Sequence, residues 1–248
     1  MSAWVVGLRL SIALALTMTV SAGCARSHGF DRAAMIEALR VDPAPNPKNM
    51  SLANQESRLS PPFRLGVFFA GHDFPSRPSI SKVEWLSADR DQLLRQLAPL
   101  RDQHILADTF VLMDATLRAE NIRGVRQLGA RYGADIILIV DGAAAVDRYN
   151  NRYAWFYPTL IGAYLAPGTE STALVMVTGS LLAVRSEWQA PIQSAEGVAK
   201  LVGSAVLVED NAALKEAKEH AIQTISRRIV DQLPLWAEEF SHSIPHSR

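Results

Sequence analysis

The 248 residues include one cysteine, and this scarcity excludes two kinds of structure. A lone thiol cannot close a disulfide within the chain, and it cannot build a zinc site from cysteines. Cys24 must therefore pair with another molecule, react, carry a modification or lie buried.

An excess of charge of one sign is also absent. The 25 Lys and Arg residues equal the 25 Asp and Glu residues, so the chain lacks the basic character that binds nucleic acids. We expect no nucleic-acid partner. A hydrophobic fraction of 48% excludes disorder throughout and suffices for one core.

Catalytic motifs are missing as well: the chain contains no GxSxG, GxGxxG, P-loop or HExxH pattern. His72 and Asp73 follow the first predicted strand and are the best candidates for proton transfer, but neighbouring loop residues usually point apart. A solvated turn explains them equally well. We predict no enzyme, no catalytic residues and no cofactor.

Metal binding is not expected either. His242 and His246 are four residues apart, but Pro245 lies between them, and a frayed tail is the simpler interpretation. Asp135 and Asp141 flank a predicted strand, where they are expected to cap ends of helices or strands.

The first 23 residues have the layout of a secretory signal. A start with one arginine precedes an apolar stretch at residues 10–20, and the small residues Ser21, Ala22 and Gly23 follow. Two other interpretations stay open: cleavage nearby that leaves Cys24 as a free thiol, and an uncleaved anchor over residues 3–22.

Ala22 and Gly23 before Cys24 resemble the cleavage box of bacterial lipoproteins, although Ser21 stands where an aliphatic residue is usual. The resemblance implies a diacylglycerol and a further acyl chain, such as palmitate, on Cys24. Such lipids hold a protein on a membrane. Ala25, in place of an aspartate, implies the outer membrane.

Residues 24–62 are expected to form a flexible tether because prolines and polar residues dominate them. Met35, Ile36 and Leu39 allow one or two helical turns near its start. We predict a globular domain at residues 63–240 and a disordered tail at residues 241–248.

Apolar periodicity predicts an α/β domain, with a mixed sheet covered by helices. The expected strands are residues 63–70, 105–113 and 136–140, followed by a hairpin at 174–184 and 188–193; the expected helices begin near residues 87, 122 and 211.

Five residues indicate where individual strands and helices begin, end or bend. Alternation from Phe63 predicts the first strand, and Ser87 is a plausible helix cap with Pro99 marking that helix's end. Gly133 can end the second helix in a left-handed conformation, and Pro234 should break or bend the last one.

Several stretches resemble the rhombotarget lipoproteins: Cys24, the proline-bearing tether, and residues 64–67, 128–137 and 158–168. The order of elements also resembles periplasmic α/β modules of the curli-secretion lipoprotein, of the Tol propeller protein and of lipoprotein activators of peptidoglycan synthases. The resemblance implies an envelope address and no particular reaction.

Residues 153–167 carry no charge and five aromatic side chains. Fifteen residues are too few to span a bilayer as a helix, and Pro158 interrupts them. We expect a buried connection over the sheet; a surface for an envelope partner or a second copy, and a contact with the membrane interface, are the alternatives.

The sequence thus predicts a lipid-anchored module of the cell envelope, facing the periplasm or the surface, that binds or assembles without catalysis. The alternative is an envelope hydrolase or other enzyme with a dispersed site near His72 and Asp73.

Overall fold

The computed structural model describes residues 27–39 and 60–242, except residues 72, 115 and 120. Its fold is mixed α/β, as predicted from the sequence. The elements are α2 (Arg32–Ala38), β1 (Phe63–Phe69), β2 (Ser81–Lys82), α4 (Ser87–Gln96), α5 (Ala98–Asp102), β3 (Leu106–Leu112), α6 (Ile122–Tyr132), β4 (Ile136–Asn150), η2 (Arg152–Phe156), α7 (Leu160–Leu165), β5 (Thr169–Ala183), β6 (Gln189–Gly203) and α8 (Asp210–His242).

The chain forms two compact units, where the sequence predicted one domain. Among described residues, unit 1 comprises residues 27–30, 146–173 and 199–214, and unit 2 comprises 31–145, 174–198 and 215–242. Strands β4, β5 and β6 and helix α8 contribute residues to both units.

The sheet has the order β3-β1-β4-β5-β6, and β2 pairs with β4 outside this path. β1 is parallel to β3 on one side and to β4 on the other. β4 pairs with β1 through Val140 and then with β2 at Ala143 and Ala144. β1 is therefore an inner strand of the parallel part of the sheet.

Helix α6 covers one face of the parallel strands in unit 2. The side chain of Asn121 accepts a hydrogen bond from the N–H of Gly124 at its start, and Gly133 ends it at a φ of 69°. Both the helix and the glycine confirm the prediction. Val125 and Leu128 on α6 belong to a buried cluster with Phe68, Leu112, Ile137, Ile139 and Leu182.

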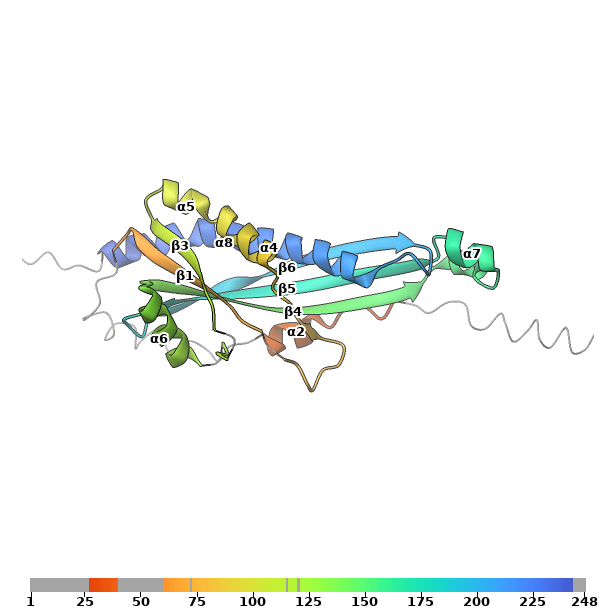
Figure 1. Ribbon diagram of the computed structural model, residues 1–248, viewed down its shortest axis with the longest axis horizontal. Coiled ribbons are helices and arrows are strands. Elements are labelled where there is room, and N and C mark those ends of the chain that lie inside the picture. Colours follow the sequence, from red (N-terminus) through yellow and green to blue (C-terminus); the bar gives the residue numbers. More distant parts are fainter. Residues whose placement is uncertain (1–26, 40–59, 72, 115, 120, 243–248) are drawn as a thin grey trace, which may run out of the picture. The chain divides into compact units, whose positions relative to one another are not determined.

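Helices α4 and α8 lie on the opposite face from α6 (Figure 1). An ion pair joins them: Lys218 Nζ lies 2.5 Å from Asp89 Oδ2, and both side chains are nearly buried. Lys218 also donates to the carbonyl oxygen of Glu84, and the Asp89 carboxylate accepts the N–H of Leu86. The pair thus ties α8 to the start of α4.

Helix α8 also packs closely against β6 in unit 2. A Cβ at Gly197 would collide with the carbonyl oxygen of Ala217, so this strand and this helix meet at a residue without a side chain. Small residues on α8 at Ala217 and Ala221 are fully buried there. Close contact of this kind needs glycine at position 197.

The first predicted strand is present as β1, and it is buried on both faces over most of its length. Pro99 follows the end of α4 at Gln96, as expected of a proline that marks a helix end, and it lies in the first turn of α5. Two other expectations were wrong. Leu86, not Ser87, is the N-cap residue of α4, and Asp89 satisfies its N–H. Pro234 does not break α8, which continues to His242 and so includes the first two residues of the expected tail.

The N-terminal part of the expected tether is also ordered. Residues 27–39 are described and contain α2, where Met35 is fully buried. In unit 2, Arg32 on α2 forms a 3.0 Å ion pair with Glu196 on β6. The predicted one or two helical turns are thus present, and they pack on the folded chain.

The Asp89–Lys218 pair yields a stability prediction. In Lys218→Met, the Asp89 carboxylate stays buried without its cation, and we expect the free energy of unfolding to fall by about 3 kcal/mol. Lys215→Met is the matched control, because Lys215 and its partner Glu219 are exposed and 4.0 Å apart; about 0.5 kcal/mol or less is expected. Chemical denaturation measures both, and equal losses would contradict the role given to the pair.

Candidate binding sites

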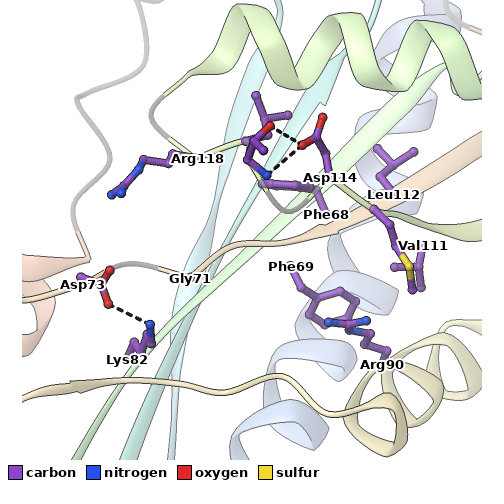
Figure 2. A pocket seen from close by; sticks show the side chains of 13 residues that line it. Phe68, Phe69, Gly71, Asp73, Lys82, Arg90, Val111, Leu112, Asp114 and Arg118 are labelled. Carbon is purple, nitrogen blue, oxygen red and sulfur yellow. Dashed lines mark hydrogen bonds and ion pairs between the residues drawn. The ribbon is translucent and has the colours of Figure 1, made fainter.

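A crevice of about 600 Å³ lies at the carboxyl ends of β1 and β3 in unit 2 (Figure 2). The chain leaves β1 for β3 through α4 and α5, and it leaves β3 for β4 through α6. These connections lie on opposite faces of the sheet (Figure 1). In parallel α/β sheets this is the usual place for a ligand.

The carboxylates that line the crevice already have partners. Asp73 forms a 3.0 Å ion pair with Lys82, as the dashed line in Figure 2 shows. Asp114 accepts hydrogen bonds from the hydroxyl and the backbone N–H of Thr116, and these bonds lower the pKa of its carboxyl. Both carboxylates are therefore engaged by other side chains of the chain.

Arg90 is one of three cationic residues that line the crevice. Its guanidinium carbon lies 5.8 Å from the centroid of the Phe69 ring, and its buried Nε has no hydrogen-bond partner in the described part of the chain. A guanidinium held on an aromatic ring can pair with an anionic group.

Of the predicted pair His72 and Asp73, the structure describes Asp73. Asp73 lines the crevice, whereas His72 lies outside the described residues. Asp135 accepts the N–H of Arg64 at the start of β1, as expected of a capping residue. Asp141 was expected at a strand end but lies buried inside β4, where it accepts the N–H of Gly142.

No group of three side chains suited to a metal ion occurs within the ranges that the structure describes. His242 is the last residue of α8, and His246 lies outside those ranges. In the same ranges, no helix has the length and apolar character to cross a bilayer.

The second candidate site is an exposed apolar surface in unit 1. Residues 151–168 leave the sheet between β4 and β5 and form η2 and α7. Trp155, Ile161 and Leu165 are 67%, 74% and 76% exposed, and Phe156 and Tyr164 are more than half exposed. We call these five side chains the apolar surface. The buried connection expected from the sequence is therefore wrong for this segment.

Backbone and side-chain hydrogen bonds close the base of this excursion. The N–H of Asn151 donates to the carbonyl oxygen of Gly168, and the amide of Asn151 donates to Pro167 and to Glu170. Tyr157 bonds to Thr169 at 2.8 Å. These hydrogen bonds fix the base of the excursion, which we call its root, and the apolar side chains lie beyond it.

Glu170 is the centre of that root. Its carboxylate lies 2.5 Å from Lys200 Nζ and 2.5 Å from the Tyr149 hydroxyl, and it accepts from Asn151. These three contacts, led by Lys200, lower the pKa of Glu170 to about 2. The carboxylate in turn raises the pKa of both Lys200 and Tyr149. At neutral pH the carboxylate of Glu170 is therefore ionised and links β5 to β4 and β6.

The chain just after Cys24 binds to the same unit. Asp147 on β4 accepts hydrogen bonds from the Ser27 hydroxyl at 2.5 Å and the Gly29 N–H at 3.1 Å. Burial raises the pKa of Asp147, but these bonds and a longer one from His28 outweigh it, so the net shift is downward. Cys24 itself, the predicted lipidation site, lies outside the described residues.

Comparison with known proteins gives structural neighbours from bacteria. PelC from Paraburkholderia phytofirmans, solved as a dodecamer, is 14% identical over 70% of this chain and 90% of its own, with a TM-score of 0.29. The DUF330 protein XCC0632 from Xanthomonas campestris is 14% identical over 82% of this chain and 97% of its own, with a TM-score of 0.35. The lipoprotein GNA1162 from Neisseria meningitidis is 14% identical over 70% of this chain and 99% of its own, with a TM-score of 0.28.

No protein-family model and no curated protein matches the chain. Identities and TM-scores as low as those of the structural neighbours assign no function. Membership of the rhombotarget family therefore stays a prediction from the residues that resemble it.

Glu170 provides a pH-dependent prediction. We expect Glu170→Gln to lower the free energy of unfolding at pH 7 by about 2 kcal/mol, because charged hydrogen bonds to Lys200 and Tyr149 are lost. The folded pKa lies below the usual 4.5, so this contribution is complete above about pH 4.5 and disappears as the pH falls to about 2. The two proteins should then converge in acid.

Glu187→Gln is the control, because Glu187 is 78% exposed in its ion pair with Arg126. Its expected effect is about 0.5 kcal/mol or less at every pH. Denaturation curves from pH 2 to pH 7 give both dependences. A Glu170→Gln deficit that stayed constant over this range would contradict the assigned pKa.

Proposed function

We propose that the protein is a bacterial envelope lipoprotein, held on the outer membrane by lipid on Cys24, and that it acts as a non-catalytic binding or assembly module. The observation that carries the proposal is the apolar surface. Five large side chains exposed together on one excursion are an unfavourable arrangement for a protein with no partner.

The order of residues 27–30 supports the anchored arrangement. Ser27 and Gly29 are bound to Asp147, so any lipid on Cys24 would be joined to unit 1 by only three residues of chain. In this proposal a short link, instead of the whole predicted tether, would separate the lipid from the first bound residue. An anchor of this kind restrains unit 1 close to the bilayer.

The crevice supports a binding role, because its carboxylates are engaged by Lys82 and Thr116 while Arg90 lies against the Phe69 ring. The Thr116 hydroxyl donates to Asp114, a pairing that also occurs between a nucleophile and its base. The alternative, an envelope hydrolase or other enzyme with a dispersed site near His72 and Asp73, would use this crevice.

Metabolic labelling with an alkyne palmitate tests the lipid anchor. The wild-type chain should incorporate the label, and its purified form should lack residues 1–23 and carry the mass of the acyl chains. In Cys24→Ser both the label and the cleavage should be lost, because the thiol that accepts the lipid is gone.

A second variant separates this role from a general effect of a thiol. Cys24→Ser combined with Ser60→Cys restores a thiol at an exposed position, and it should remain unlabelled. An unmodified Cys24 thiol, or an intact leader on the wild-type protein, would overturn the proposed anchor.

A further inference from the structure

The apolar surface has the composition of a membrane interface. Residues 153–167 carry no charge, and the exposed side chains combine Trp155 and Tyr164 with Phe156, Ile161 and Leu165. Tryptophan and tyrosine favour the headgroup level of a bilayer, because their rings are apolar and their polar atoms reach water. Aliphatic side chains beside them supply apolar area for the acyl boundary.

Two side-chain hydrogen bonds satisfy backbone N–H groups of the excursion that would otherwise bind water. The Asn151 side chain accepts the N–H of Tyr153 at the start of η2, and the Thr159 hydroxyl accepts the N–H of Gly162 at the start of α7. These caps satisfy donors that a helix start leaves open. Donors that are satisfied internally reduce the cost of leaving bulk water.

The position of residues 27–30 favours the bilayer as the binding partner of the apolar surface. Cys24 lies three residues before Ser27, so its backbone is within about 10 Å of the segment bound to Asp147. In the other direction, β4 runs from Asp147 to Asn150, about 10 Å along the strand, and η2 follows. The predicted lipid and the apolar surface therefore originate from neighbouring parts of one unit.

We propose that the apolar surface of η2 and α7 inserts into the interfacial region of the bilayer that holds the lipid on Cys24, so that unit 1 contacts the membrane at two places. This inference rests on the proposed lipid anchor. The anchor keeps the bilayer at a high effective concentration around the surface, which favours lipid over a freely diffusing protein partner.

Site-specific fluorescence tests the insertion. Ile161→Cys and, as a second position, Leu165→Cys place a thiol on the apolar surface, and both residues are so exposed that folding should be unaffected. The full lipidated chain is labelled with NBD maleimide and reconstituted into phosphatidylethanolamine–phosphatidylglycerol vesicles. Glu216→Cys, at an exposed position of α8 in unit 2, is the control.

We expect the label at positions 161 and 165 to be quenched at least threefold more by headgroup-proximal nitroxide lipids than the label of the Glu216→Cys control. Quenching by aqueous iodide should show the reverse order. Iodide quenching equal to that of the control would overturn the inference. Shielding from both quenchers would also overturn it, because it would indicate a protein partner or a second copy on this surface.

The same labelling distinguishes failure of the anchor from failure of the insertion. Cys24 is the only native thiol, so a lipidated wild-type chain should take up no maleimide. Labelling of the wild type would overturn the anchor and, with it, the inference that rests on it. A wild type that stays unlabelled, together with an iodide-accessible position 161, would overturn the insertion alone.

Discussion

The parallel pairing of β1 on both of its edges is the constraint from which the architecture of unit 2 follows. A strand with parallel neighbours on both sides is fed by crossover connections, and helices then cover both faces of the sheet. Both faces of β1 are consequently buried, by α6 on one side and by α4 and α8 on the other. The same crossovers leave the carboxyl ends of β1 and β3 open between them, which places the crevice. The Asp89–Lys218 pair joins α8 to α4, and because both side chains are nearly buried, either charge would be costly without the other.

Unit 1 follows a different principle, because polar contacts and not an apolar core determine its geometry near the excursion. Glu170 joins β5 to Lys200 on β6 and to Tyr149 on β4, so three strands are linked through one carboxylate. Asn151 uses its backbone and its side chain to close the base of the excursion. With the base held in this way, η2 and α7 keep their apolar side chains outside the sheet. These side chains are thus exposed on a segment whose base is fixed by hydrogen bonds.

Sequence patterns predicted the parts of the fold that local rules determine. Residues 122–140 were predicted correctly because an amphipathic helix, a left-handed glycine and an unalternated apolar run occur in order, each with its own signal. The full length of β4, β5 and β6 was not predicted. The missed residues 141–150, 169–173 and 194–203 mix polar and apolar side chains, and their burial depends on neighbours that are distant in the sequence. The break expected at Pro234 is absent, because the burial of Leu233 and Ala237 on one stripe of α8 keeps the helix continuous past a local helix breaker. Arg90, Glu170 and Lys200 carried no motif; only their partners in space give them a role.

The contact between Ser27 and Asp147 has the largest effect on the interpretation of the protein, and no local pattern signals it, because the two residues are 120 positions apart. A proline-rich stretch after a lipidation site is normally interpreted as a spacer whose reach grows with the square root of its length. Here the spacer-like residues 40–59 follow α2 instead of preceding the first contact with the folded chain. The distance between a lipid on Cys24 and unit 1 then depends on three residues, and the stretch 40–59 contributes nothing to it. With the proposed lipid on Cys24, such a link would limit the orientations open to unit 1 and favour contact between its apolar surface and the bilayer.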